Sequence, residues 1–280
     1  AERIMKKYAG NTIKYIYLFL GCLLIALPLY LTIANAMKTP QQLSENFFSL
    51  PESLYLNNFA EVISKANFFR YAFNSVFITV VGVALIQIIV PFTAFPIARR
   101  MKTEPYFKFL FYFITAGIFV PFEVKMLPLV KLMSSIRMLN PIGLILLYSC
   151  GALCQDIFLM VGYIKTIPRD MEEASAIDGC NRIQTIWKIA FPIMKPMLAT
   201  LLIKDTLWIW NDFMMPLLIL NVSDKYWTLP LFQYNFKGTY SVDFTLAFAA
   251  FSLSIIPMML VFVLAQKKIM GGLTAGAVKS

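Results

Sequence analysis

The 280-residue sequence contains no histidine, which removes the side chain that most often serves as a general base. Triads that place a histidine between a nucleophile and a carboxylate are excluded for the same reason. The GxxxxGK[ST] loop that binds nucleotide phosphates is also absent from the sequence. If the protein uses ATP, the nucleotide must therefore bind to another polypeptide.

Cysteine is scarce as well, with four residues in the chain. Cys22, Cys150 and Cys154 lie in long apolar stretches, so no disulfide framework is indicated. Cys150 and Cys154 share a helix face, but without histidine a metal site there would need help from Asp156. We interpret both as small apolar packing residues and expect no metal site.

Charged residues make up only 14% of the chain, whereas hydrophobic residues make up 59% and the mean hydropathy is +0.69. These values are typical of an integral membrane protein rather than a soluble domain. A net charge of +10 would suggest nucleic-acid binding in a soluble chain. Here we expect the cations to set membrane topology, and we expect no nucleic-acid partner.

Long uncharged runs predict an all-α protein that crosses the membrane six times. Three runs, between Lys14 and Lys38, Arg70 and Arg99, and Asp243 and Lys267, each exceed the roughly 20 residues that a helix needs to cross the hydrocarbon. Three further runs are interrupted by charges. The six predicted spans are residues 15–37, 70–98, 107–131, 140–164, 197–220 and 244–266.

The cations indicate how the chain is oriented. If the amino end is cytoplasmic, most Lys and Arg residues fall in inside segments, as expected because these residues resist translocation. Both termini are then cytoplasmic, with a tail at 267–280 and a long inside loop at 165–196. A single transmembrane domain would occupy residues 1–280.

Within this loop, Asp170 and Glu173 have the spacing of a capping box, which predicts a short helix from about Met171 to Gly179. Asp178 could cap a second helix or contact a partner. The second helix is indicated by Ile183, Ile186, Trp187 and Ala190 at helical spacing. Taken alone, two such helices are also typical of surface helices packed beneath a membrane domain.

The sequence Glu-Ala-Ser-Ala-Ile-Asp-Gly at 173–179, followed by Ile189, Pro192 and Pro196, resembles the EAA loop of ABC importer permeases. Ser175 stands where that family usually has alanine. Two further segments are similar to the carbohydrate-uptake, maltose-type branch of that family: Trp-Asn-Asp-Phe at 210–213 and Gly-Gly-Leu-Thr-Ala-Gly-Ala-Val-Lys at 271–279. The likeness extends over nearly the whole chain.

This resemblance implies a type I ABC importer permease fold with a cytoplasmic coupling helix, in a bacterial or archaeal plasma membrane. It implies no catalytic residue and no cofactor in this chain, because ATP and Mg²⁺ would bind to the partner ATPase. The implied partners are a second permease in a heterodimer, two ATPase domains, and an extracellular or periplasmic sugar-binding protein. The implied ATPase-coupling residues are Glu172, Glu173, Ala174, Ser175, Asp178, Gly179, Ile189, Pro192 and Pro196.

Polar side chains within the spans are candidates for a sugar pathway. Asp205, Trp208 and Asp212 follow one another at i, i+3 and i+7, and sugars suit such a combination of acceptors and an aromatic ring. The same residues could instead bond neighbouring spans or loops. The candidate pathway residues are Tyr148, Gln155, Asp156, Trp208, Asn211 and Asp212. The candidate contacts with a binding protein are Tyr234 and Asn235.

The function predicted from these features is ATP-driven import of a sugar, such as an oligosaccharide, by alternating access. One alternative is an ABC permease for another small solute. A gradient-driven secondary transporter would also have polar residues within its spans, but it would not explain the inside loop. A membrane enzyme is the alternative with the least support, since no nucleophile or metal cluster accompanies Asp156, Asp205 and Asp212.

Overall fold

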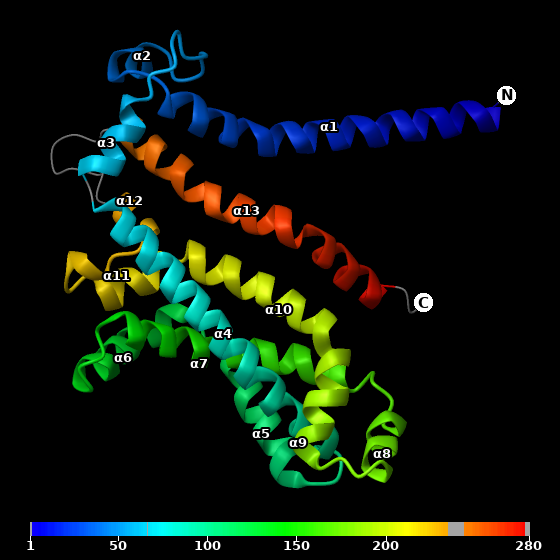
Figure 1. The fold of residues 1–280 in the computed structure, drawn as a ribbon. Coiled ribbons are helices and arrows are strands. Elements are labelled where there is room, and N and C mark those ends of the chain that lie inside the picture. Colours follow the sequence, from blue (N-terminus) through cyan, green and yellow to red (C-terminus); the bar gives the residue numbers. More distant parts are fainter. Residues whose placement is uncertain (1, 66, 235–243, 278–280) are drawn as a thin grey trace. The chain divides into compact units, whose positions relative to one another are not determined.

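The computed structural model describes residues 2–65, 67–234 and 244–277, and all regular structure in these residues is helical. The chain forms two compact units, one of residues 1–68 and 233–257 and the other of residues 69–232 and 258–280. The α-helices are α1 (Glu2–Ala36), α2 (Pro40–Glu45), α3 (Asn57–Lys65), α4 (Phe68–Arg100), α5 (Pro105–Ala116), α6 (Phe122–Ser135), α7 (Pro141–Ile164), α8 (Asp170–Ile177), α9 (Arg182–Thr185), α10 (Phe191–Asn211), α11 (Met214–Leu220), α12 (Leu229–Tyr234) and α13 (Phe244–Ala277) (Figure 1). Two 3₁₀ turns, Gly117–Phe119 and Asp224–Tyr226, and a π-helix, Ile186–Ala190, complete the described secondary structure.

Five helical stretches in the described residues are long and apolar enough to cross a membrane, and a sixth candidate is a bent pair. The five are Lys14–Ala36, Phe68–Arg100, Pro141–Ile164, Ile186–Asn211 and Phe244–Val261. They coincide broadly with five of the predicted spans, because a long run without charge leaves a helix as the only way to satisfy the backbone in lipid. The chain is thus built as a multi-pass helical protein.

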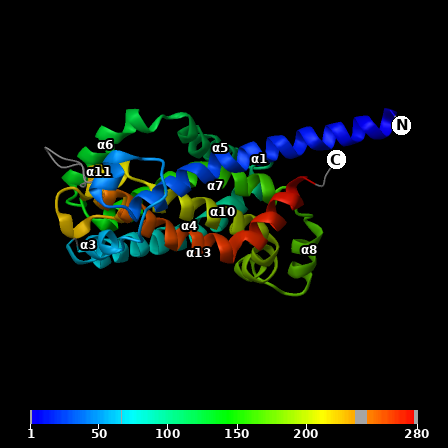
Figure 2. The ribbon, with the colours of Figure 1, turned by 90° about the horizontal axis from the view of Figure 1, so that it is seen from above.

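The third predicted span, 107–131, is a broken helix in the structure. The helical segments Pro105–Phe119 and Phe122–Ser135 meet at an angle of 105°, a bend that can be followed in Figure 1 and from above in Figure 2. Pro121 lies at the break, where its ring cannot continue a helix from the preceding turn. Sequence reasoning noted the charges in this span but did not predict the bend.

The fifth and sixth predicted spans also differ from the helices observed. Helix α10 ends at Asn211, Asp212 is extended, and α11 begins at Met214, so the segment 197–220 is not one helix. Helix α13 continues to Ala277, so the backbone of the predicted tail at 267–280 is helical over most of its length.

In the first unit, α1 is apolar, and no residue in its most hydrophobic 18-residue stretch is buried within the chain. A helix of this composition is not stable with its apolar surface in water, so its surroundings must be lipid or another polypeptide. The segment that follows α1 turns back on itself. The Asn58 side-chain amide donates to the carbonyls of Ala36 and Lys38, both at 2.8 Å, and fixes this turn.

Lys38 is fully buried in the same unit, and its ammonium donates to the carbonyls of Asn46 (2.9 Å) and Phe47 (3.3 Å). Asn46 is the residue that ends α2, so a cation lies where the helix presents unpaired carbonyls. Burial lowers the pKa of the Lys38 ammonium. The lysine thus ties the end of α1 to the end of α2.

The core of the second unit is formed by α4, α7, α10 and α11. Ile86, Leu144, Ile157, Met194 and Ile219 are fully buried within it. Helix α7 packs against α5, α10 and α11, which places it at the centre of this unit. The core therefore holds the long helices in place around the sites described below.

Polar contacts in the second unit join α4 to the segment that precedes α12. The Asn74 amide donates to the carbonyls of Lys225 and Trp227, both at 2.9 Å, and the Ser75 hydroxyl accepts from the amide of Leu229 at 2.8 Å. These bonds fix a loop that is 151 to 154 residues away in the sequence onto the first turns of α4.

We predict that Lys38→Met loosens the segment between α1 and α3. The substitution removes the donor for two carbonyls, and an unsatisfied buried polar group costs about 1 to 3 kcal/mol. Chymotrypsin should cleave detergent-solubilised Lys38→Met faster than wild type at the aromatic residues Phe47 and Phe48. Lys102→Met, at an exposed position, serves as the control, and equal cleavage of both variants would contradict the assignment.

Candidate functional site

The segment that joins α7 to α10 contains the short helix α8, which runs from Asp170 to Ile177 as the capping pattern approximately predicted. The cap itself lies one residue earlier than predicted, because the carbonyl of Arg169 accepts from the amides of Glu172 and Glu173. Gly179 has φ +82°, and the amide of Cys180 donates to the carbonyl of Ser175 at 2.9 Å. This is a Schellman ending, and Gly179 takes the left-handed conformation that such an ending requires.

The start of α9 is capped by Asn181, not by Asp178. The Asn181 side chain accepts from the amide of Gln184, and the Gln184 side chain accepts from the amide of Asn181, both at 2.9 Å. This reciprocal arrangement is a capping box. The spacing of Asn181 and Gln184 was available in the sequence as a signal. Asp178 is exposed and does not cap α9, so contact with a partner is the role that remains of the two considered for it.

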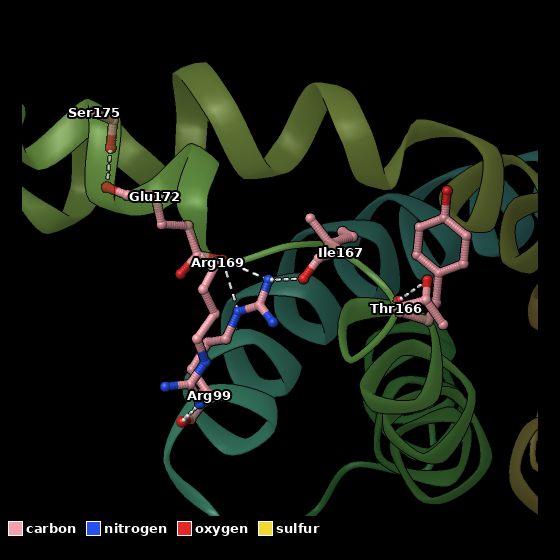
Figure 3. Close-up of polar contacts among 7 residues, drawn as sticks. Arg99, Thr166, Ile167, Arg169, Glu172 and Ser175 are labelled. Carbon is pink, nitrogen blue, oxygen red and sulfur yellow. Dashed lines mark hydrogen bonds and ion pairs between the residues drawn. The ribbon is translucent and has the colours of Figure 1, made fainter.

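Arg99, at the end of α4, binds the loop that leads into α8 (Figure 3). Its guanidinium donates to the Glu172 carboxylate at 2.7 Å through Nε and to the carbonyl of Ile167 at 3.1 Å. In return, Arg169 donates to the carbonyl of Arg99 at 2.8 Å. Glu172, predicted as a partner contact, is thus half-buried and held within the chain. Sequence reasoning used Arg99 only as evidence for topology.

Ser175 joins α8 to α9. Its hydroxyl lies 3.0 Å from that of Thr185 and donates to the carbonyl of Glu172 at 2.8 Å, and both Ser175 and Thr185 are buried. An alanine at position 175 could not make either bond. The side chain predicted to contact a partner therefore faces the inside of the α8–α9 hairpin.

The opposite face of α8 is exposed. Glu173, Ala174 and Asp178 are exposed there together with the apolar side chains of Met171 and Ile177, which are 47% and 87% accessible. Small, acidic and apolar groups thus share one surface, which we call the α8 face. Its five members all lie within 8 residues on one side of the α8–α9 hairpin. The other side of this hairpin is held by the bonds of Glu172 to Arg99 and of Ser175 to Thr185.

Helix α9 continues through the π-helix 186–190 into α10 without a break. Pro192 has no amide to donate, and the amide of Phe191 bonds instead to the carbonyl of Ile186, five residues earlier. The Trp187 ring packs against Phe92 of α4 and against Phe191, with ring centroids 5.2 and 5.1 Å apart. Ile189 lies in the π-helix, and the predicted coupling residues Pro192 and Pro196 are exposed in the first turns of α10.

A cavity of about 630 Å³ lies in the second unit, between the broken α5–α6 pair, α7, α10 and α11. Its size is in the range of about 300 to 1,000 Å³ usual for small-molecule sites. Of the predicted pathway residues, Trp208 and Asp212 line it. The lining residues that sequence reasoning did not assign to a pathway are Gly117, Val120, Phe122, Lys125, Leu129, Leu147, Cys150, Gly151, Cys154, Met214 and Met215.

Tyr148, also predicted for the pathway, supports the two lining residues from behind. Its ring is buried and meets the Trp208 ring edge-on at 5.3 Å. Its hydroxyl donates to Asp212 at 2.8 Å, and the other Asp212 oxygen accepts from the amide of Met214 at 3.0 Å. The structure therefore brings three of the predicted residues together, Tyr148 from α7, Trp208 from α10 and Asp212 from the extended position after α10.

Asp156 and Asp205 are fully buried and share the Lys204 ammonium, which bonds to Asp156 and lies 2.9 Å from Asp205. This cluster joins α7 to α10 and is not among the residues that line the cavity. Its position indicates that Asp156, predicted for the pathway, holds helices together. A cation between carboxylates lowers the cost of burying them.

The remaining predicted residues lie apart from this group. Gln155 is exposed and does not line the cavity. The amide of Asn211 donates to the carbonyl of Leu207 one turn earlier, at 2.8 Å. Tyr234 ends α12, and Asn235 lies outside the described residues. Groups of three or more His, Cys, Asp or Glu that could hold a metal ion are absent among residues 2–65, 67–234 and 244–277.

Comparison with known proteins gives a match to the family described as "Binding-protein-dependent transport system inner membrane component" over residues 92–270. The chain is 42% identical to the multiple sugar-binding transport system permease protein MsmG of Streptococcus mutans, over 95% of this chain and 96% of that protein. It is 33% identical to the probable starch degradation products transport system permease protein AmyC of Thermoanaerobacterium thermosulfurigenes, over 95% and 97%.

Among solved structures, the fold is similar to that of a chain in a bacterial ABC transporter involved in the import of the acidic polysaccharide alginate. The TM-score is 0.82, the identity is 21%, and the match covers 94% of this chain and 97% of that one. At this identity the likeness shows a shared fold.

We predict that Arg99 and Glu172 are energetically coupled. In a double-mutant cycle with Arg99→Met and Glu172→Gln, the coupling energy should be about 1 to 3 kcal/mol, because the pair is shielded and hydrogen-bonded. The cycle can be measured by SDS-induced unfolding of the detergent-solubilised protein. Arg100 and Glu104, 3.7 Å apart and more exposed, form the matched control pair, for which about 0.3 to 0.5 kcal/mol is expected. Equal coupling in both pairs would argue against a special role for Arg99.

We further predict that Lys204→Met destabilises the protein by about 3 to 5 kcal/mol, since two buried carboxyl groups then lack their cation. Thermal unfolding of the detergent-solubilised chain should show a lower Tm, and adding Asp205→Asn should restore part of the loss. Lys108→Met, at an exposed position, is the control. A Tm of Lys204→Met that matches this control would mean that the cluster does not hold the helices together.

Proposed function

The chain belongs to the family of binding-protein-dependent transport system inner membrane components, and on this basis we propose that it is the permease subunit of an ATP-driven importer for an oligosaccharide. Family membership makes it a transport component that crosses the membrane several times. The names of its relatives, a multiple sugar-binding system and a starch degradation products system, support a carbohydrate substrate.

We propose that the α8 face is where an ATPase subunit binds. The observation that carries this proposal is that Met171 and Ile177 expose apolar side chains beside Glu173, on a hairpin fixed from behind. Burial of an exposed isoleucine contributes about 1.5 to 3 kcal/mol, and the small Ala174 lets a partner approach closely. Glu173 would supply an acceptor for hydrogen bonds from the partner.

The contacts behind α8 supply the mechanical link. Arg99 joins α8 to α4 through Glu172, and Ser175 joins it to α9 through Thr185. Because α9 continues into α10, a displacement of α8 would move two of the long helices, α4 through Arg99 and α10 through α9. In an alternating-access cycle, closure of the ATPase subunits would move the α8 hairpin and thereby reorient the helices that line the cavity. Such coupling requires that the ATPase bind the two states with different affinity.

The remaining parts of the assembly follow from the family. We propose that the chain pairs with a second permease, that two ATPase domains bind ATP and Mg²⁺ on the cytoplasmic side, and that a sugar-binding protein delivers the substrate from outside. Both termini and α8 would then be cytoplasmic, as the distribution of cations favours. The exposed apolar surface of α1 offers one place for contact with lipid or with the second permease.

The proposal predicts that Glu173→Lys or Ile177→Glu releases the ATPase. Each change should weaken binding by about tenfold or more, because it opposes a charge or removes the apolar contact. The measurement is retention of the co-expressed ATPase subunit on the affinity-tagged permease in detergent, together with sugar-stimulated ATP hydrolysis.

Glu104→Lys is the matched control, since it reverses an exposed charge that lies outside the α8 face. It should retain the ATPase, and all three variants should be extracted from the membrane in equal amounts. Full retention of the ATPase by both α8 variants would refute the docking surface.

A further inference from the structure

The cluster that joins α7 to α10 has more acidic groups than basic ones. Asp156 of α7 and Asp205 of α10 share the ammonium of Lys204. Both aspartates are fully buried, whereas the Lys204 side chain is 30% accessible. If both carboxyl groups were ionised, two negative charges would face one positive charge. A charge without a partner inside a protein is so costly that the group is neutralised instead.

The contacts of the cluster leave two carboxyl oxygens unused. Oδ1 of Asp156 accepts from the Lys204 ammonium, and Oδ1 of Asp205 lies 2.9 Å from the same nitrogen. The Oδ2 atoms of both aspartates are buried and have no hydrogen-bond partner among the described residues. Two carboxylates that contact one ammonium lie close together, so their charges also repel each other. A proton on one of the unused oxygens removes this repulsion.

The other cations of the described helices around the cluster do not supply the missing charge. Arg99 and Arg100 of α4 are paired with glutamates, and Lys125 of α6 lines the cavity. The remaining cations of α4, α5, α6, α10 and the π-helix are exposed: Arg70, Lys108, Lys131, Lys188 and Lys195. Helix α11 carries no charged side chain.

The other titratable groups of α7 and the end of α10 are directed elsewhere. Tyr148 and Asp212 bond to each other, Tyr163 donates to the carbonyl of Ile193, and Cys154 lines the cavity. The two buried aspartates also lie more than one turn from the ends of their helices, beyond the range of the helix dipole. The structure thus leaves a proton as the simplest group that can neutralise the cluster.

We propose that Asp156 and Asp205 hold one proton between them and form a proton-binding site inside the permease. With Lys204, this proton makes the cluster neutral. It belongs to the pair rather than to either residue, because two interacting carboxyl groups titrate together. Loss of the proton at higher pH leaves two like charges between α7 and α10 and loosens the packing of two helices that line the cavity. The inference goes beyond the proposed function and does not depend on the substrate.

Infrared spectroscopy detects such a proton, because a protonated carboxyl group has a C=O stretching band that a carboxylate lacks. The full chain would be purified with its co-expressed partner subunits into lipid nanodiscs at about pH 7, where exposed carboxyl groups are ionised. Wild type should have this band. Asp156→Asn and Asp205→Asn should each lose it, because one carboxylate and one ammonium need no proton. Glu104→Gln, which changes an exposed carboxyl group, is the control and should keep the band.

The pH dependence of stability provides a second measurement. The folded chain holds one proton more than the unfolded chain, whose carboxyl groups are ionised above about pH 5. Raising the pH therefore favours unfolding, and the equilibrium constant should increase by up to about tenfold per pH unit. The chain has no histidine, which is the group that most often titrates near neutral pH. Between about pH 6 and 8, the Tm of wild type and Glu104→Gln should fall relative to that of both Asn variants.

Several outcomes would overturn the proposal. A wild-type spectrum without the band would show that the pair holds no proton, and a band that persists in Asp156→Asn would show that the proton is not shared. A wild-type Tm that rises with Na⁺ or K⁺ at constant ionic strength would assign the site to a metal cation. Failure of both Asn variants to co-purify with the ATPase would also contradict it, because a cluster that is neutral without the proton should fold. Sugar uptake is not measured, so these outcomes do not bear on the proposed function.

Discussion

The Arg99 guanidinium connects the end of α4 to the loop from which α8 projects, and the position of α8 depends on it. The ion pair with Glu172, the bond to the carbonyl of Ile167 and the return bond from Arg169 form a closed set of contacts within a few residues. Charge-assisted bonds of this kind are roughly twice as strong as neutral ones. A short helix would otherwise have no fixed orientation, because 8 residues are too few to be stable alone.

The sequence was sufficient for features governed by local rules. Uncharged runs predicted the long helices, and the glycine at 179 predicted where α8 ends. The 105° bend between α5 and α6 was not predicted, since composition gives the length of a span but not whether it is straight. The π-helix was missed for a related reason: Pro192 indicates that a hydrogen bond is lost but does not say where the backbone adjusts.

The candidate sites show the same division. Two residues of the predicted polar stripe, Trp208 and Asp212, line the cavity, but the residue that contacts both, Tyr148, could be related to them only in three dimensions. Glu172 and Ser175 were assigned to a partner because they lie in the same motif as Glu173. The fold turns them inward, to Arg99 and Thr185. A motif gives the residues in order, whereas the packing of the helix decides which of them face outward.

The π-helix at 186–190 has a geometric consequence for the two sites. Its hydrogen bond from the amide of Phe191 to the carbonyl of Ile186 spans one residue more than a bond in the α-helix that follows, and one residue corresponds to a rotation of about 100° around the helix axis. If this extra residue were absorbed, every side chain from Phe191 onward would swing around the axis by that angle relative to α8. A single residue in the π-helix thus determines the direction around the axis of α10 in which Trp208 points.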